Sequence, residues 1–254
     1  MERYWDMSAM TEPIIPFGRP LRDAHFLIAP EYTPLNHGSY GTYPKSVRDD
    51  FHKWQALSEA RPDPWVRYDY PRHLDSSIDT IASFMGVPAA DVVLVKNAST
   101  GVNTVFRSLR FVEGDVILHL STVYGANAKT FEYLRETTPV DSVSLDMQYP
   151  VSDDETVQRF CESVEDIKLH GRTPRVAIFD TITSMPGVRV PWERLVERCS
   201  AMGVLSFVDA AHGVGHLELD LQKYQPDFLV SNLHKYVDQF LGSSGFLPSI
   251  QSRC

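Results

Sequence analysis

Short apolar runs alternate with helix-like stretches over residues 91–233, and this alternation restricts the chain to few folds. The runs are rich in branched and aromatic residues, as in strands buried on both faces of a sheet. They cover residues 92–96, 115–120, 143–147, 175–181, 204–210 and 227–233. Helix-like stretches separate successive runs. This order predicts an α/β fold with a mostly parallel, doubly wound sheet.

Two helices are predicted before the first strand. In the first, over 46–62, Val47, Phe51 and Trp54 recur at helical spacing and Pro62 ends the pattern. The second covers about 71–87, with Gly86 as its C-terminal stop. We expect three parts: an N-terminal arm over 1–30, a large domain over 31–236 and a divergent tail over 237–254.

Bulk properties exclude several classes of protein. The 254 residues carry a net charge of −9 and are 43% hydrophobic, which is typical of a globular chain and unfavourable for binding nucleic acid. The cysteines, Cys161, Cys199 and Cys254, are far apart and predict free thiols rather than a metal site. The sequence contains no membrane-length apolar run and no signal peptide, so we expect a cytoplasmic protein.

Polar residues follow five of the predicted strands. In a doubly wound sheet, ligands bind beyond the carboxyl ends of the strands, so these residues should meet at one crevice. The five segments are NAST (97–100), TVYGA (122–126), TITS (181–184), DAAH (209–212) and SNLHK (231–235).

Asp209 and Lys235 suggest the chemistry of this crevice. A partly buried lysine has a lowered pKa and can form an imine with a carbonyl, while a buried carboxylate can pair with a cationic ring nitrogen. These are the two groups that pyridoxal 5′-phosphate (PLP) requires. His212 would contact the ring, and Ser231 and His234 the phosphate. The residues alone also allow Asp209 as a helix cap and Lys235 as a solvated lysine.

Further candidates come from the other segments. The backbone N–H groups of Ala98, Ser99 and Thr100 would face an anion at a helix N-terminus, and the two hydroxyls would add donors. Three other roles follow, of which that of Tyr124 is also open to a core tyrosine and that of Asn36 and His37 to structural loop residues. Tyr124 would stack on the ring, Ser184 would donate near it, and Asn36 and His37 would contact substrate beside Gly38 and Gly41.

Six segments, taken in chain order, resemble segments of class V, fold type I PLP-dependent enzymes. They are LNHGSYG, NAST, VYGA, FDTITSMPGVRVP, VDAAHGVG and SNLHKY. The resemblance covers about residues 17–236. It is strongest to the branch containing isopenicillin N epimerase-like, fungal cysteine desulfhydrase-like and hercynylcysteine sulfoxide lyase-like enzymes. The spacing of VDAAH and SNLHK is fairly specific, whereas NAST alone is not.

The resemblance implies a role for each candidate. Lys235 would bind the cofactor covalently and take the Cα proton, Asp209 would hold the pyridinium proton, and His212 would lie near the ring hydroxyl. Tyr124 would stack on the ring. The phosphate would be bound by Ser99, Thr100, Ser231 and His234. Asn36 and His37 would face the substrate, with Arg67 near the entrance. The resemblance also implies a homodimer.

The reaction implied is C–S lysis of an amino acid, by β-elimination through an external aldimine and a Cα carbanion. The cofactor motifs equally allow epimerisation, or carbon–carbon condensation in a fungal alkaloid-type pathway. A nucleotide-binding α/β protein is disfavoured, because the chain lacks GxGxxG and GxxxxGK[ST].

The resemblance ends after Tyr236. Only 19 residues follow Lys235, and they do not match the strand and small C-terminal domain that relatives have there. We therefore expect a truncated or alternatively spliced product, or a shifted reading frame, with the small domain largely missing. The alternative that follows for function is that this chain is a catalytically impaired, truncated relative of these enzymes.

Overall fold

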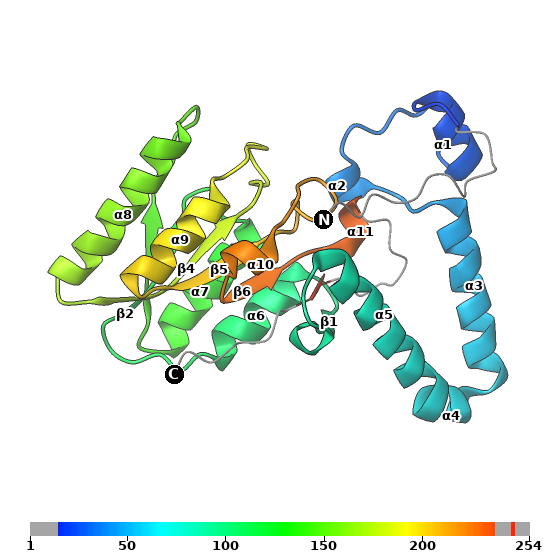
Figure 1. Ribbon diagram of the computed structural model, residues 1–254, viewed down its shortest axis with the longest axis horizontal. Coiled ribbons are helices and arrows are strands. Elements are labelled where there is room, and N and C mark those ends of the chain that lie inside the picture. The colour runs from blue at the N-terminus through cyan, green and yellow to red at the C-terminus, as the bar shows by residue number, and fades with distance from the viewer. Residues whose placement is uncertain (1–14, 237–244, 247–254) are drawn as a thin grey trace.

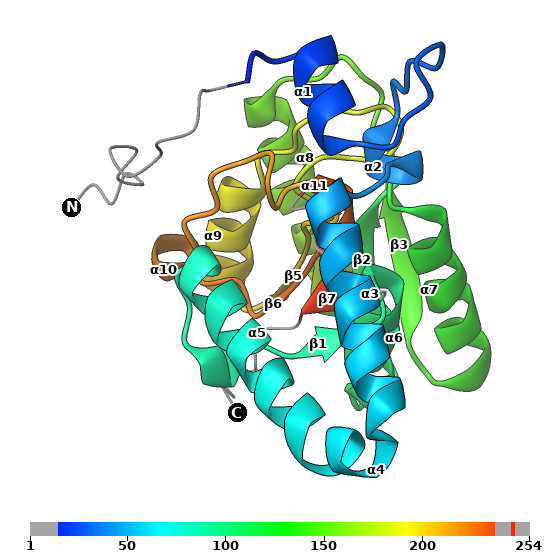
Figure 2. The same cartoon turned by 90° about the vertical axis from the view of Figure 1, so that its right-hand side faces the viewer.

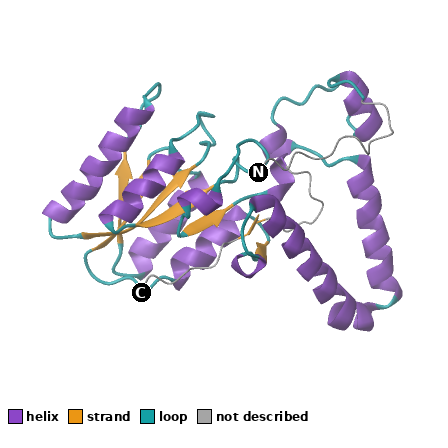
Figure 3. Ribbon diagram, viewed as in Figure 1, coloured by secondary structure: helices purple, strands orange, loops and turns teal. Residues whose placement is uncertain are grey.

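A parallel five-stranded sheet forms the centre of the protein, seen here in a computed structural model that describes residues 15–236 and 245–246. Its strand order is β3-β2-β4-β5-β6, and all neighbours run parallel. Figure 1 and Figure 3 show the sheet between layers of helices. The strands are β2 (Asp115–Leu120), β3 (Asp141–Leu145), β4 (Thr173–Asp180), β5 (Leu205–Asp209) and β6 (Phe228–Val230).

Helices cover both faces of this sheet, which explains why the inner strands are largely apolar, whereas the edge strand β3, DSVSL, is only partly buried. On one face, α6 (Ala98–Ser108) and α7 (Gly125–Thr137) pack around Phe106 and Phe131. On the other, α8 (Asp153–Leu169) and α9 (Trp192–Met202) join the C-terminal end of α5 (Tyr70–Met85). The predicted α/β class with a parallel sheet is therefore confirmed.

One predicted strand is not part of the main sheet. Within 92–96 only β1 (Leu94–Val95) forms, and it pairs antiparallel with β7 (Gly245–Phe246). Val93 is 45% exposed and Leu94 packs against the core, so the run is apolar without being buried on both sides. The expectation of a buried strand before NAST was wrong for this reason. Apart from β7, the predicted divergent tail lies outside the described residues.

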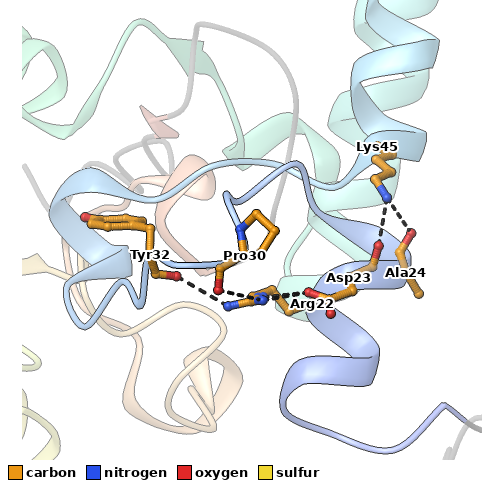
Figure 4. Close-up of polar contacts among 6 residues, drawn as sticks. All are labelled: Arg22, Asp23, Ala24, Pro30, Tyr32 and Lys45. Carbon is orange, nitrogen blue, oxygen red and sulfur yellow. Dashed lines mark hydrogen bonds and ion pairs between the residues drawn. The ribbon is translucent and has the colours of Figure 1, made fainter.

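The described part of the N-terminal arm is held by side chains that bind backbone carbonyls (Figure 4). Helix α1 (Arg19–His25) buries no residue. Lys45, at the start of α3 (Lys45–Ala60), donates from Nζ to the carbonyls of Asp23 and Ala24 at 2.8 and 3.2 Å. These carbonyls lie in the last turn of α1, where carbonyls have no partner within the helix. The ammonium group of Lys45 therefore caps α1.

A helical hairpin projects away from the sheet (Figure 1 and Figure 2). It consists of α3, α4 (Pro62–Pro64), η2 (Trp65–Asp69) and α5. The predicted end of the first helix is confirmed to within two residues, and Pro62 begins the next turn. Gly86 ends α5 in the left-handed conformation at φ 66°, as predicted. Of the residues in these elements, α3 buries none, whereas α5 buries Ile81, Ala82 and Met85.

Short elements complete the described chain: α2 (His37–Tyr40), η3 (Ala89–Asp91), α10 (Leu221–Tyr224) and α11 (Leu233–Tyr236). In the described part of the chain, no helix combines the length and apolar character needed to cross a membrane. The same part contains no group of three or more His, Cys, Asp or Glu side chains arranged to hold a metal ion. Cys161 and Cys199 are free thiols, as expected, and Cys254 lies outside the described residues.

Candidate active site

Lys235 and Asp209 lie near enough for their charges to act on each other, because their strands are neighbours. Asp209 is the last residue of β5, and Lys235 lies in α11, which begins just after β6. Burial lowers the pKa of Lys235, opposed by the negative charges of Asp209 and Asp180. The Lys235 Nζ lies 2.8 Å from Nε2 of His212. The lysine is therefore partly withdrawn from solvent and held by a side chain, unlike a freely solvated one.

The Asp209 carboxylate is buried, with 3% exposure, and both its oxygens accept hydrogen bonds. The Ala211 N–H donates to Oδ1 at 3.0 Å, and Asn127 Nδ2 donates to Oδ2 at 2.8 Å. Burial raises the pKa of Asp209, while these two donors and the charge of Lys235 act in the opposite direction. No helix begins at Asp209, so the helix-cap alternative does not apply.

His212 links the lysine to Tyr236. Its Nδ1 lies 3.1 Å from the Tyr236 hydroxyl, while its Nε2 faces Lys235. Burial, followed by the charge of Lys235, lowers the pKa of His212 to about 4, so the ring is neutral near pH 7. When Lys235 donates to Nε2, the ring proton must lie on Nδ1 and is donated to Tyr236. The Tyr236 ring stacks on His216, with centroids 3.6 Å apart.

The start of α6 is connected to the site by the side chain of Asn232, because the strand before α6 is not part of the main sheet. Asn232 Oδ1 accepts from the Ala98 N–H at 2.9 Å. Asn97 Oδ1 accepts from the Thr100 N–H at 2.8 Å and from the Thr100 hydroxyl at 3.1 Å. The predicted outward-facing N–H groups of Ala98 and Thr100 are thus already bonded within the protein. Half-buried Ser99 lies between them.

The segment LNHGSYG also lies at the site, because α2 packs on α11. A Cβ added at buried Gly38 would clash with the Tyr236 hydroxyl and lie 3.3 Å from Cε1 of His212. Gly38 therefore permits the close approach that its sequence context predicted, here to Tyr236. The same helix brings half-buried His37 to the site, with exposed Asn36 directly before it. Their contact with substrate remains a prediction.

Four other predicted residues lie at strand ends of the sheet. Tyr124 is 48% exposed at the start of α7, and half-buried Ser184 follows β4. Ser231 is fully buried, and its hydroxyl donates to the Ala210 carbonyl at 2.8 Å, so the backbone satisfies this hydroxyl. His234 is exposed beside Lys235.

Arg67 is not brought to the other predicted residues. It lies in η2, next to α4 at the far end of the hairpin from α11 (Figure 1). Its Nε pairs with Asp63 Oδ1 at 2.7 Å, and both side chains are about two-thirds exposed or more, at 66% and 71%. Within this chain, Arg67 is a surface ion-pair residue, and an entrance role stays a prediction.

Sequence reasoning missed Asn127 and Asp180. Asn127 lies on the buried face of α7 with Thr130, Phe131 and Leu134, so a polar residue in an apolar helical stripe was the available signal. Asp180 ends β4 directly beside Asp209, in register and 3% exposed. Its Oδ2 has no hydrogen-bond partner among the described residues. Burial and the charge of Asp209 raise the pKa of Asp180 well above its ordinary value.

Two clefts elsewhere in the described chain are separate from this cluster. One of about 570 Å³ lies between the end of α5 and residues 214–222, and includes His216. The other, of about 1080 Å³, lies at the opposite end of the sheet around Leu205 and Asp227. Neither is lined by Lys235 or Asp209, so the chemical groups rather than a large cavity identify the site.

The arrangement fits the predicted cofactor. PLP needs an amine of lowered pKa for its aldehyde and a buried carboxylate for its ring nitrogen. Lys235 and Asp209 supply these groups at neighbouring strand ends. The unpartnered Oδ2 of Asp180 is a further buried polar atom beside them, consistent with a site built to receive a polar group.

Similar proteins support this assignment. An L-cysteine desulfhydrase-like protein, lolT1 of Epichloe uncinata, is 38% identical over 88% of this chain and 49% of its own length. Hercynylcysteine sulfoxide lyase of Schizosaccharomyces pombe is 27% identical over 84% of this chain and 53% of its own. The chain thus spans about half the length of the curated relatives it matches.

Among solved structures, a variant of C-DES with glycine covalently linked to its PLP cofactor has a TM-score of 0.78 to this chain. It is 17% identical, and the match covers 89% of this chain and 58% of C-DES. This likeness confirms the predicted fold, that of the large domain of fold type I PLP enzymes. The sequence model for aminotransferase class-V matches residues 72–245. The chain belongs to the aminotransferase class-V family.

Proposed function

We propose that the chain binds PLP and acts as a C–S lyase on a cysteine-like amino acid, by β-elimination. The observation that carries the proposal is the placement of Lys235, whose pKa is lowered, and the buried carboxylate of Asp209 at neighbouring strand ends, where the charge of each acts on the other. The names of relatives support the reaction: lolT1 is described as L-cysteine desulfhydrase-like, and C-DES as a cystine C–S lyase. PLP itself is confirmed as the cofactor at the level of the family.

Residues of this chain would hold PLP as follows. Lys235 would bind the aldehyde carbon, and Asp209 would face the ring nitrogen. Ser99, at the start of α6, and His234 would bind the phosphate, and Tyr124 would cover the ring. When bound, PLP supplies an electron-withdrawing ring that stabilises negative charge at the substrate Cα.

The protein's own groups then act on the proton and on orientation. Lys235 takes the Cα proton on its neutral amine, which burial makes available at lower pH than for a solvated lysine. Asp209 keeps the ring nitrogen protonated by opposing its positive charge. His212 holds the Lys235 Nζ in place through the 2.8 Å contact. The electron pair left at the substrate Cα would form a Cα=Cβ double bond, and the Cβ–S bond would break with its electron pair leaving on sulfur as a thiolate.

Epimerisation and condensation rank lower: the same lysine would serve all three reactions, but relatives with names that refer to cysteine desulfhydrase or lyase reactions support C–S lysis. We further propose that the chain forms a homodimer through the α3–α5 hairpin. Helix α3 buries none of its residues within the chain, although most helices in proteins are stabilised by burying a face. Asn36, His37 and Arg67 are the proposed substrate contacts.

The test is covalent trapping of PLP on the purified chain. The chain is mixed with PLP and reduced with borohydride, and peptide mass spectrometry locates the modified lysine. We expect modification at Lys235 in the wild type and its loss in Lys235→Ala. Lys223→Ala, which changes an exposed lysine, serves as the matched control and should retain it.

Substrate turnover is then measured separately. The PLP-loaded chain receives cysteine, and sulfide and pyruvate are quantified. Release of both supports C–S lysis. Trapping without release would contradict the lyase proposal while leaving the cofactor site intact, and equal trapping in Lys235→Ala would contradict the site itself.

A further inference from the structure

Two carboxyl groups lie side by side in the interior of the site. Asp180 and Asp209 are register partners at the ends of the parallel strands β4 and β5, and each is 3% exposed. Register partners in a sheet project from the same face. Two buried carboxyls at paired register positions do not both ionise readily, because each negative charge disfavours the other and burial disfavours both. This favours a proton on one of them.

The surroundings of the two carboxyls are unequal. Asp209 accepts two hydrogen bonds, from the Ala211 N–H and from Asn127 Nδ2. Oδ2 of Asp180 has no partner among the described residues, and the hydrogen bond that favours the charged form of Asp180 comes from its own backbone N–H. The charge of Lys235 acts on both carboxyls, and His212 lies against Lys235. Neither Lys235 nor His212 therefore favours a charge on one carboxyl over the other. The hydrogen-bond donors therefore favour the negative charge on Asp209.

Asn127 is the side chain that makes this difference. It is 1% exposed on α7, and its Nδ2 lies 2.8 Å from Asp209 Oδ2. An amide nitrogen donates at every pH and cannot itself take the negative charge. Phe131 and Leu134 on the same face of α7 are packed in the core, which fixes the helix and hence the position of the amide.

We propose that Asn127 is a positioning residue that keeps Asp209 as the carboxylate of a buried carboxyl pair, with Asp180 as its neutral, protonated partner. The pKa directions agree, since burial and the charge of Asp209 raise that of Asp180 well above its ordinary value. The catalytic consequence rests on the proposed function: an ionised Asp209 can oppose a ring cation, and a neutral Asp180 adds no second charge beside it. The charge assignment itself does not require the cofactor.

The first measurement is made on the cofactor-free chain. Aspartate carboxyl carbons are labelled with ¹³C, and NMR follows their titration in the wild type, in Asp180→Asn and in Asp115→Asn. Asp115 is the matched control, because it is buried at 4% exposure at the opposite end of the sheet. We expect one carboxyl signal to remain neutral at pH 7, to disappear in Asp180→Asn and to persist in Asp115→Asn.

Replacement of Asn127 then tests its role. In Asn127→Leu, which has a similar shape and no donor, the titration midpoint of Asp209 should rise by about one to two pH units. Asn127→Ala provides a second variant without the donor. If both fold poorly, as judged by circular dichroism, the wild-type and Asp180→Asn titrations still test the charge assignment.

The outcomes are distinct from those of the proposed function. Ionisation of both carboxyls at pH 7, a neutral signal that survives in Asp180→Asn, or an unchanged Asp209 midpoint in folded Asn127 variants would overturn the inference. Failure of the chain to bind PLP would overturn the proposed function without altering these cofactor-free titrations. If the charge assignment and the proposed function both hold, Asn127→Leu should also weaken PLP binding about tenfold or more, measured by fluorescence titration.

Discussion

His212 gives the site a pH dependence that can be measured as stability. Its pKa is lowered by burial to about 4 in the folded chain, against 6.5 for an unperturbed histidine. As the pH falls below 6.5, the unfolded chain takes up a proton that folded His212 refuses until about pH 4. The free energy of unfolding therefore decreases over this window.

Replacing His212 with glutamine should remove this loss. Between pH 7 and pH 5, the free energy of unfolding should fall by about 1 kcal/mol more in the wild type than in His212→Gln, a figure reduced to allow for the partial solvent exposure of the ring. Urea denaturation at the two pH values provides the measurement. His170→Gln changes an exposed histidine and should behave like the wild type. Equal losses in all three chains would contradict the lowered pKa.

At the scale of elements, the contact between α2 and α11 shapes the site. Gly38 faces the Tyr236 hydroxyl without room for a side chain. Gly38→Ala should therefore force the two helices apart and destabilise the chain by about 1–3 kcal/mol. Because Tyr236 and Lys235 share α11, we also expect weaker covalent trapping of PLP.

A second substitution separates this clash from a general effect of alanine. Tyr236→Phe removes the hydroxyl that the new methyl would meet, so the double variant should regain part of the stability lost in Gly38→Ala. Gly125→Ala, at a helical position with no atom within 4 Å of the added methyl, should be neutral or slightly stabilising. Thermal unfolding of the four variants provides the comparison. An equally unstable double variant would show that the hydroxyl is not the main obstacle, because the ring carbon Cζ, 2.8 Å from the added Cβ, remains in place.

At the scale of the whole molecule, the α3–α5 hairpin is a projecting part in which α3 buries no residue within the chain. Apolar side chains along it are exposed, among them Leu57 at 45% and Val66 at 65%. In the proposed homodimer these side chains are covered by the second copy. Leu57→Glu and Val66→Glu should then weaken self-association, because a charge would be buried at the interface.

Sedimentation equilibrium over a range of concentrations tests this proposal. We expect a dimer for the wild type and a shift to monomer in the two hairpin variants. Leu169→Glu changes an 83% exposed leucine at the end of α8 and should leave the mass unchanged. A wild-type monomer at every concentration would remove the homodimer from consideration for this chain.

The sequence by itself determined the fold class and the chemical pair. Strands that are buried on both faces are largely apolar, so the inner strands of the parallel sheet could be recognised from the sequence pattern. Polar residues that directly follow such runs must lie at the carboxyl edge, which placed Asp209 and Lys235 together. The exception was 92–96, where an apolar run arises from packing on one side, and periodicity does not distinguish the two cases.

Only the tertiary structure decided which partners complete the site. Asn127 lies 82 residues from Asp209 and on a helix, so no local spacing reveals their hydrogen bond. Asp180 becomes a neighbour of Asp209 through strand pairing, and its missing partner is a property of the packed interior. Arg67 likewise lies in the hairpin, where it pairs with Asp63, away from the other predicted site residues. Sequence pattern reports which face or edge a residue occupies, whereas contacts between distant segments depend on how the layers pack.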